Sequence, residues 1–598
     1  MYLIPNPKSY KEYTGTFNIK RGIEIIISPN CSFEDLDSAI IIQKDIFNKF
    51  GFKANIRKSY REYENSIILL TDDNFKDESY RLSIDNKNVK IIGKSGSGLF
   101  YGVQTLRQLI IRDGFSLKSL EIEDEPYFEN RGFFHDVTRG KVPTLNTLKN
   151  LIDKASFYKI NQVQIYIEHS FAFKGMSEVW LNKDPLTSEE ILLLDRYAKE
   201  RHVELVPALA TFGHLYEVLR TKTYQHLCEL DGKSEDEFSF FERMAHHTLN
   251  VSDNESILLV KKMIDEFLPL FTSNKFNICC DETFDLGKGK SEDLAMKNKE
   301  GFLYVEFLNK VIDIVKSYNK KVLFWGDVIG NHNEFLDKIP EDVVCLSWNY
   351  SNEAKENDIK KIASSNREVY LCPGVCGWNR FMNLIDNSLE NIYRMVSYAK
   401  KYNATGILNT DWGDFGHINL LSNSMVGLAF GGSLSWNPNI DRQFDKFYEE
   451  ISLIEFGDRS KRLVKLLVMI SKCQKANFED IIRFKEFNNT SLNFDIYKLK
   501  DDLKRSVEIS EEIQSLSYQV LDKMALQEFI VSSKGIILTN KFFIEVIEKS
   551  NNRIELALEI EEWFYDYMGI WRSRNKESEL YRLRDVIEYL CKYLRDNR

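Results

Sequence analysis

The chain has 598 residues, 43% of them hydrophobic and 28% charged, with a net charge of −10 and a pI near 5.7. It is too long for one hydrophobic core and should form about two to four domains, and its composition is typical of folded globular proteins rather than disordered ones. The acidic balance argues against nucleic acid as a partner, because binding phosphates requires a concentrated basic surface.

The N-terminus and the cysteines predict a cytoplasmic protein. Residues 1–7 lack the charged and then apolar pattern of a secretion signal, and no apolar run of about 18 residues predicts a membrane span. The nine cysteines are odd in number and scattered, which favours reduced thiols over a disulfide framework. Cys372 and Cys376 lack a second pair of cysteines or histidines, so we expect no metal site and no cofactor.

Residues 1–125 predict a small α+β domain. Residues 24–27 and 66–70 are short apolar runs typical of strands, and residues 35–49 have helical spacing. A second helix is expected to start near Gly98 and to lead toward the middle of the chain.

Residues 126–440 predict an α/β fold, a closed (β/α)8 TIM barrel. Apolar runs rich in β-branched residues alternate with segments of helical spacing, and the strands of such a barrel are continuous apolar runs because both faces are covered. The eight predicted strands are residues 133–138, 163–168, 203–211, 276–281, 322–326, 343–350, 368–374 and 406–412.

Residues 441–598 predict a helical domain. Leu499, Leu503, Val507, Ile513 and Leu516 recur at roughly three- to four-residue spacing, as on one face of a helix. We expect this part of the chain to support a homodimer or to close the rim of the active site.

Each predicted barrel strand ends at or near a polar or aromatic residue, and the active sites of such barrels lie at that end. These residues are Asp136, Glu168, His214, Asp281, Glu282, Trp325, Trp348, Trp378 and Trp412.

The adjacent acids Asp281 and Glu282 are the strongest candidates for chemistry. Successive strand residues point to opposite faces, so both carboxylates can share a site only if the chain leaves the sheet between them. Repulsion would then favour one proton on the pair, and an acid beside an anion suits the cleavage of a glycosidic bond. The alternative is a helix cap or a surface acid pair.

Four tryptophans at strand ends favour a sugar as the substrate. Pyranose rings present apolar C–H faces that pack on indole rings, while their hydroxyls bind charged side chains such as Asp414. Ordinary packing explains any one of these tryptophans more easily than it explains all four.

Three segments resemble the β-N-acetylhexosaminidases of glycoside hydrolase family 20. With an N-terminal α+β domain and a helical C-terminal extension, the layout looks most like the three-domain bacterial branch of that family. The resemblance covers nearly the whole chain. It is carried by residues 131–139 (RGFFHDVTR), residues 206–214 (VPALATFGH) and the pair Asp281–Glu282, followed in order by Trp325, Trp348, Trp412 and Asp414.

The resemblance implies a retaining enzyme that releases terminal β-linked N-acetylhexosamine from an oligosaccharide or glycoconjugate. The substrate's own 2-acetamido oxygen would attack the anomeric carbon and give an oxazolinium-like intermediate. Glu282 would protonate the leaving oxygen and then activate water. Asp281 would orient the acetamido group and stabilise its developing positive charge.

The resemblance also assigns the binding roles. Trp412 would pack against the sugar, Asp414 would bind the hydroxyls at its far edge, and Trp325 and Trp348 would surround the acetamide methyl. Arg131 would grip the ring hydroxyls, with a structural ion pair at the domain junction as the alternative.

The chain departs from the family pattern at two places. The family usually has an aspartate after the second strand to back the histidine that supports the acid, whereas this chain has Glu168–His169 before His214. Many members hold the acetamide oxygen with a tyrosine beyond the seventh strand, but residues 372–381 contain none. Asn379, next to Trp378, is the residue we expect to donate that hydrogen bond.

Three other functions remain open. A catalytically silent carbohydrate-binding barrel would keep the tryptophans but would not require two repelling carboxylates. A metal-dependent hydrolase would need a His-x-His pair, which His135–Asp136 does not supply. A glycosidase that uses the same neighbouring-group route on protein-linked sugars would be expected to carry two adjacent aspartates.

Overall fold

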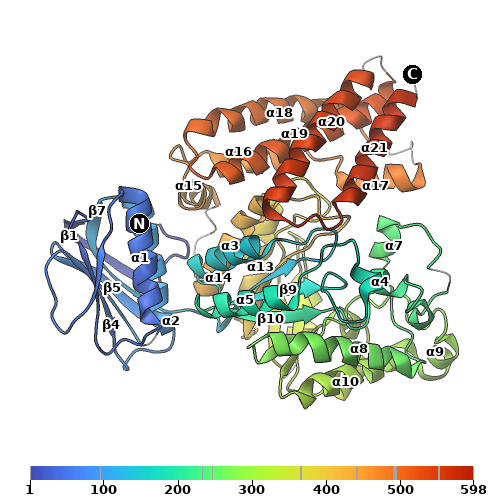
Figure 1. The fold of residues 1–598 in the computed structure, drawn as a ribbon, viewed down its shortest axis with the longest axis horizontal. Helices are drawn as coiled ribbons and strands as arrows, with labels where there is room; N and C mark the ends of the chain where they lie inside the picture. Colours follow the sequence, from blue (N-terminus) through green and yellow to red (C-terminus); the bar gives the residue numbers. More distant parts are fainter. Residues whose placement is uncertain are drawn as a thin grey trace.

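The computed structural model describes residues 2–94, 96–231, 234–245, 247–363, 367–439, 442, 444–488, 494–549 and 553–596. Three groups of elements follow one another along the chain: a seven-stranded sheet, a closed eight-stranded barrel and a group of helices (Figure 1). The predicted fold class is therefore confirmed. The domain limit near residue 125 stays a prediction, and the limit at residues 440–441 lies outside the described residues.

The N-terminal part is a mixed sheet with two helices packed together on it. The helices are α1 (Asp35–Phe50) and α2 (Gly96–Asp113), close to their expected positions. The strands are β1 (Ser9–Asn18), β2 (Glu24–Ile27), β3 (Asn55–Lys58), β4 (Ser66–Thr71), β5 (Tyr80–Ile84), β6 (Asn88–Gly93) and β7 (Ser116–Asp124), in the order β1-β7-β5-β6-β4-β2-β3.

All eight predicted barrel strands are present, and every neighbouring pair is parallel. The fourth is much shorter than expected, because it ends four residues before Asp281. The strands are β8 (Asn130–Asp136), β9 (Gln162–Ile167), β10 (Glu204–Leu209), β11 (Lys275–Asn277), β12 (Lys321–Trp325), β13 (Val344–Trp348), β14 (Val369–Cys372) and β15 (Gly406–Asp411).

Helices follow the barrel strands, and the longer ones cover the barrel from outside. The last of them, α14, is apolar on all sides because it is buried on all sides. The longer helices are α3 (Leu145–Phe157), α5 (Ser188–Lys199), α8 (Asn254–Phe267), α10 (Glu300–Ser317), α12 (Glu356–Ala363), α13 (Ile385–Lys401) and α14 (Met425–Trp436). The shorter ones are α4 (Ser177–Trp180), α6 (Tyr216–Leu219), α7 (Phe240–Met244), α9 (Glu292–Asn298) and α11 (Asp327–Asn331).

The C-terminal part is helical, as expected, and lies against the barrel (Figure 1), while its first helix, α15, also contacts α2 of the N-terminal part. Leu499 and Ile513 are buried on the inner face of α18, whereas Val507 is partly exposed. The helices are α15 (Phe444–Ile454), α16 (Leu463–Ser471), α17 (Phe478–Phe487), α18 (Ile496–Ser515), α19 (Lys523–Glu548), α20 (Arg553–Arg574) and α21 (Leu580–Asp596).

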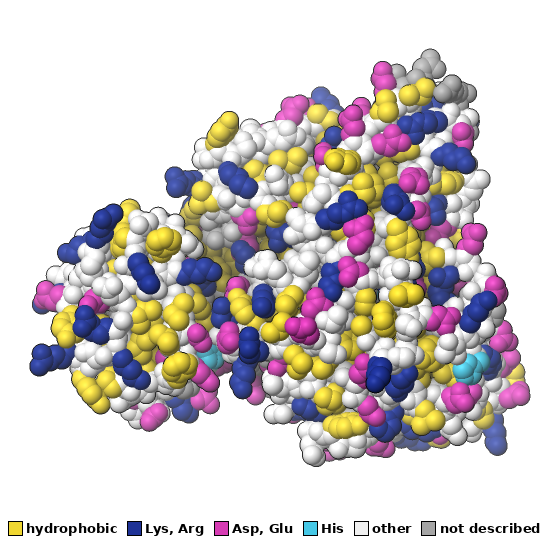
Figure 2. All heavy atoms as spheres, in the orientation of Figure 1, with side chains coloured by type: hydrophobic (Ala, Val, Ile, Leu, Met, Phe, Trp, Pro, Cys, Tyr) yellow, Lys and Arg dark blue, Asp and Glu magenta, His cyan; other side chains and the backbone are white. Residues whose placement is uncertain are grey.

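The surface carries both charge signs. On the face drawn in Figure 2, basic and acidic side chains are interspersed over all three parts of the molecule. Within the described ranges, none of the helices is both long and apolar enough to cross a bilayer.

Candidate active site

The two adjacent acids reach one site because the chain leaves the barrel sheet before them. Beyond β11, Cys279, Cys280 and Glu282 all have positive φ, 57°, 64° and 47°. Such residues cost free energy and persist only where their surroundings hold them. Here the backbone N–H of Trp325 donates to the carbonyl of Cys279, and the Tyr304 hydroxyl donates to the carbonyl of Cys280, each at 2.9 Å.

His214 lies beside both acids. Its Nε2 is 3.0 Å from Oδ2 of Asp281 and 3.6 Å from Oε2 of Glu282. Gly213 makes this approach feasible, because a Cβ at that position would lie 2.6 Å from the carbonyl oxygen of Asp281. The glycine before the histidine is therefore a steric requirement of the site.

The acids line a hollow of about 200 Å³ at the C-terminal end of the barrel strands. Asp281 is the more deeply buried, with 8% of its side chain exposed against 25% for Glu282. A larger depression of about 990 Å³ lies elsewhere, between α13 and α15, and is lined largely by polar and acidic residues. The hollow is lined by Arg139, Met244, Asp281, Glu282, Trp348, Tyr350, Trp378, Trp412 and Asp414.

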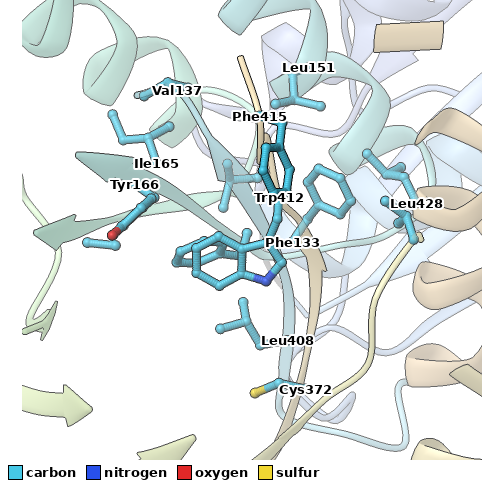
Figure 3. Close-up of a cluster of buried hydrophobic side chains, with 14 of the residues drawn as sticks. Phe133, Val137, Leu151, Ile165, Tyr166, Cys372, Leu408, Trp412, Phe415 and Leu428 are labelled. Carbon is cyan, nitrogen blue, oxygen red and sulfur yellow. The ribbon is translucent and has the colours of Figure 1, made fainter. Parts of the chain in front are cut away.

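Aromatic rings form much of the wall. The Trp348 and Tyr350 rings stack with centroids 5.0 Å apart, and Trp378 lies 5.0 Å from Tyr350. The indole N–H of Trp412 donates to the Tyr350 hydroxyl at 2.8 Å. Figure 3 shows the buried cluster around Trp412, which includes Phe133.

Arg139 connects the acids of the mouth. Its guanidinium donates to Glu168 at 3.1 Å and to Asp414, and it lies 4.9 Å from the centroid of the Trp412 ring. Its Nη2 is 2.9 Å from Nδ1 of His214. A guanidinium has only donors, so Nδ1 accepts and the histidine proton sits on Nε2, which faces the two acids.

The ends of the first and last barrel strands are tied together at this mouth. One carboxylate oxygen of Asp136 accepts from the N–H groups of Thr138 and Arg139, and the other accepts from the N–H of Gly413. Gly413 lies between Trp412 and Asp414. This acid therefore fixes the two loops that carry the guanidinium and the indole.

Asp327 is a third acid at the site, which we did not predict. Its Oδ2 accepts from the N–H of Glu282 at 3.1 Å. Burial raises the pKa of Asp327 to about 8, and the charges of Asp281 and Glu282 add to the effect. Both effects favour the protonated form of Asp327, and this form limits the negative charge beside Glu282.

The C-terminal helices also reach the mouth. Glu579, just before α21, accepts from His169 and from the guanidinium groups of Arg243 and Arg582 at 2.7, 2.8 and 2.8 Å. Burial lowers the pKa of His169 to about 4, although Glu579 opposes this shift. His169 follows Glu168, and Glu168 accepts from Arg139, which lines the hollow. Glu579 therefore contacts the site through these residues rather than directly.

Arg131 does not lie at the mouth, so the expectation that it binds the sugar is wrong. It is the second residue of β8, so it lies at the opposite end of the barrel, where its guanidinium donates to Glu78 at 2.8 and 3.0 Å and to the carbonyls of Phe128 and Lys159. The structure instead shows the alternative that we gave for Arg131, an ion pair with Glu78 that joins the barrel to the N-terminal part of the chain. Arg139, at the other end of the same motif, occupies the mouth.

Two further expectations need correction. The side-chain amide of Asn379 donates to Glu479 on α17 at 2.9 Å, so this donor is directed away from the sugar pocket. Trp325 is fully buried beneath Trp412, with ring centroids 5.8 Å apart, and supports the platform rather than forming its surface. Glu168 faces Arg139, and Arg139 stands between it and His214.

Simple signals would have found most of the residues that we missed. Asp327 and Tyr350 each follow the observed end of a barrel strand by two residues, and Arg139 follows Asp136 by three. Met244 comes from α7 in a long connection, where no pattern marks it. Among the described residues, no group of three or more His, Cys, Asp or Glu side chains is arranged to hold a metal ion.

Comparison with known families identifies the family of the chain. Residues 1–125 match the model of glycosyl hydrolase family 20, domain 2, and residues 128–417 match the catalytic domain of the same family. The chain belongs to glycosyl hydrolase family 20. Its two matched regions are domain 2 and the catalytic domain of that family, and the relatives that it matches include proteins named β-hexosaminidases.

The relatives are distant. The β-hexosaminidase of Porphyromonas gingivalis is 24% identical over 335 residues, which cover 50% of this chain and 41% of that protein. The β-hexosaminidase of Vibrio furnissii is 24% identical over 405 residues, which cover 62% and 63%. The matched region thus spans less than two thirds of either relative.

Solved structures share the fold. The chitobiase of Flavobacterium johnsoniae matches with a TM-score of 0.64 at 17% identity, over 94% of this chain and 95% of that one. The N-acetyl-β-hexosaminidase of Streptomyces plicatus, in complex with Thio-NAglucal, matches with a TM-score of 0.63 at 19% identity, over 77% and 95%.

Proposed function

We propose that this family 20 hydrolase is a retaining exo-β-N-acetylhexosaminidase. It releases a terminal β-linked N-acetylglucosamine or N-acetylgalactosamine from an oligosaccharide or glycoconjugate. The observation that carries the proposal is that Asp281 and Glu282 line one small hollow together with Trp348, Trp378 and Trp412. The family 20 exo-β-N-acetylglucosaminidase of Vibrio harveyi, which shares the fold, is described in complex with N-acetylglucosamine.

The different exposure of the two acids supports a division of roles. Glu282 is the more exposed, so it can protonate the leaving oxygen and then activate water, a role worth about 10²- to 10⁴-fold in rate. Asp281 is deeper and would accept from the acetamido N–H. Its fixed negative charge favours the cationic oxazolinium-like state more than the neutral substrate, which lowers the barrier.

The substrate supplies the nucleophile. Attack by the acetamido oxygen on the anomeric carbon breaks the bond to the leaving oxygen, which takes the proton of Glu282. Water then opens the ring of the intermediate and returns a proton to Glu282. No side chain needs to bond to the sugar, because the reacting oxygen is already held beside the anomeric carbon.

Arg139 takes the binding role that we first assigned to Arg131. Its planar fork of donors suits neighbouring hydroxyls, and its contact with Asp414 puts an acceptor next to those donors. Tyr350 takes the role first assigned to Asn379, because its hydroxyl lies on the wall beside Trp348 and Trp412. We propose that it holds the acetamide oxygen.

A pair of aryl glycosides tests the proposal. An aryl β-N-acetylglucosaminide should be cleaved, while the matching β-glucoside, which lacks the acetamido group, should not. Comparable rates on both would remove the substrate-assisted route. Binding of N-acetylglucosamine without turnover of any N-acetylhexosaminide would instead favour the silent carbohydrate-binding barrel.

Further measurements address the remaining expectations. A panel of gluco- and galacto-configured substrates identifies the preferred sugar. Light scattering of the full chain tests the predicted homodimer, and fractionation of the source cells tests the predicted cytoplasmic location.

A further inference from the structure

Helix α17 contacts two loops of the barrel mouth, one at each of its ends. These loops follow β10 and β14, the third and seventh strands of the barrel. Four strand positions separate them, so they lie on opposite sides of an eight-stranded ring. Figure 1 shows α17 beside α7, at the edge of the helical group that faces the barrel.

The first end of α17 holds the loop that carries Trp378. The N–H of Phe478 donates to the carbonyl of Asn379 at 3.2 Å, and the side-chain amide of Asn379 donates to Glu479 at 2.9 Å. Gln474, just before the helix, exchanges two further hydrogen bonds with the backbone of Met382. Trp378, which lines the hollow, directly precedes Asn379.

The other end holds α7, which carries Met244. The carboxylate of Glu486 accepts from the Ser239 hydroxyl at 2.5 Å and from the N–H groups of Phe240 and Phe241 at 2.7 and 3.3 Å. The ring of Phe241 lies 4.8 Å from that of Phe487. Met244 ends this one-turn helix and lines the hollow, so Glu486 anchors the wall opposite Trp378.

The helix between these contacts is rigid. It has ten residues, about 15 Å at 1.5 Å per residue, and Asn477 and Asp480 form a capping box at its start. Phe484 is fully buried and packs on Phe542 and Tyr593, with ring centroids 5.2 and 5.0 Å away. A capped and packed helix transmits a displacement of one end to the other.

Most contacts that hold the catalytic pair come from other elements. Tyr304, Trp325 and Asp327 hold the segment of Asp281 and Glu282 from α10, β12 and α11. Gly213 belongs to the loop after β10 but lies at its start, next to the strand and before α6 and α7. A change at α17 should therefore alter how the sugar is held and leave the proton transfers intact.

We propose that α17 is a bridge that fixes the separation of the Met244 and Trp378 walls, with Glu486 and Glu479 as its positioning residues. The helical domain then determines the width of the pocket that receives the terminal sugar. This inference relies on the proposed function only for the identity of the substrate.

Single and double variants test the bridge by kinetics. In Glu486→Ala and in Glu479→Ala, KM for an aryl N-acetylhexosaminide should rise about 3- to 10-fold, the loss expected for hydrogen bonds to a charged group in a partly solvated place, while kcat changes less than about twofold. Loss of the contacts at either end of α17 is enough to release the separation of the two walls. The double variant should therefore resemble the weaker-binding single variant, whereas independent effects would multiply.

Matched controls separate the bridge from a general effect of charge removal. Glu561→Ala breaks an exposed pair with Arg595 between α20 and α21 and should leave KM unchanged. Glu486→Gln keeps an oxygen acceptor and should restore most of the affinity. If Glu486→Ala does not fold, the Gln variant and Glu479→Ala still give the comparison. Unchanged KM in folded Glu486→Ala and Glu479→Ala, or multiplicative effects, would overturn the bridge.

Hydrogen exchange tests the bridge without any substrate. Glu486→Ala should speed amide exchange at residues 239–245, the segment that Glu486 contacts, and also at residues 376–381. Glu479→Ala should speed exchange at residues 376–381 and also at residues 239–245. Faster exchange only in the loop next to the mutated residue would also overturn the inference. A wild-type protein that neither binds nor cleaves N-acetylhexosaminides would overturn the proposed function instead, and the exchange result would stand by itself.

Discussion

Two buried arginines lie near opposite ends of strand β8, and their surroundings differ in a way that distinguishes a structural site from a chemical one. At the bottom of the barrel, Arg131 is fully buried between the rings of Tyr101 and Trp436, at 5.5 and 5.1 Å. At the mouth, Arg139 is 5% exposed and lies over the Trp412 ring. Both pair with carboxylates and contact aromatic rings.

The two sites differ in whether protein groups alone satisfy the donors and the acids. The donors of Arg131 go to Glu78, to Tyr101 and to backbone carbonyls, so the bottom is a closed ionic junction between two parts of the chain. The mouth has more acids than cations around an open hollow. Such an arrangement favours a ligand whose positive charge grows during the reaction.

Glu282→Gln should have the largest effect on activity and should leave the Arg131 junction unchanged. Without a proton donor, kcat/KM on substrates with poor leaving groups should fall about 10²- to 10⁴-fold. An aryl glycoside with an acidic leaving group should lose less in the step that expels it. Activity on both substrates measures this, with circular dichroism to verify folding, and equal losses on the two would contradict the role of acid.

Asp281→Asn should have the next largest effect. The amide keeps the size of the side chain but loses the charge that stabilises the oxazolinium-like state, and a preorganised group of this kind is typically worth about 10²- to 10³-fold in kcat. The thermal midpoint should change little. A variant that keeps full activity would remove Asp281 from the mechanism.

Exchanging each arginine for lysine tests the comparison most directly. Arg139→Lys should lower kcat/KM about 10- to 100-fold, because one ammonium group cannot replace the fork toward Asp414, Glu168 and the sugar. Arg131→Lys should instead lower the thermal midpoint, since it leaves buried partners unsatisfied, and its folded fraction should keep kcat/KM near wild type. The opposite pattern would reverse the two assignments.

The sequence contained enough to locate the barrel strands but not all of their ends. Strands covered on both faces are continuous apolar runs, so their positions were predictable. The end of β11 was not, because Ile278, Cys279 and Cys280 stay buried after the chain has left the sheet. Left-handed residues, and not a change in burial, end this strand.

The binding residues show the same limit. The motif from Arg131 to Arg139 has an arginine at each end, and only the direction of β8 decides which one reaches the mouth. Trp378 and Asn379 are adjacent, yet one lines the hollow and the other donates to α17. Met244 is held by residues more than 200 positions later in the chain, a contact that no local pattern reveals.

Tyr350→Phe should have a moderate effect on binding. Removing the hydroxyl takes away one hydrogen bond to the acetamide and the acceptor of the Trp412 indole N–H, so KM should rise about 5- to 10-fold. Asn379→Ala tests our first assignment, and Glu479→Ala is its matched control, because both variants remove the same hydrogen bond and should raise KM equally if Asn379 only contacts α17. A larger loss in Asn379→Ala on an N-acetylated substrate than in Tyr350→Phe would restore Asn379 as the acetamide ligand.

Asp327→Asn should have the smallest effect, visible in stability rather than in turnover. The folded protein holds the Asp327 proton up to about pH 8, whereas an unfolded aspartate releases it near pH 3.9. Between these values the folded state binds one more proton than the unfolded state, so the contribution of Asp327 to stability falls as pH rises through this window. Asparagine cannot ionise, and its amide oxygen can still accept from the N–H of Glu282.

The thermal midpoint of Asp327→Asn relative to wild type should therefore rise between pH 5 and pH 8.5, by about 1–3 °C for a chain of this size. Scanning calorimetry at several pH values measures the difference. Asp585→Asn, at a residue with 54% of its side chain exposed, is the control and should give a flat difference. A flat difference for Asp327→Asn as well would mean that Asp327 is ionised beside Glu282, and that the mouth carries one more negative charge than a protonated Asp327 gives it.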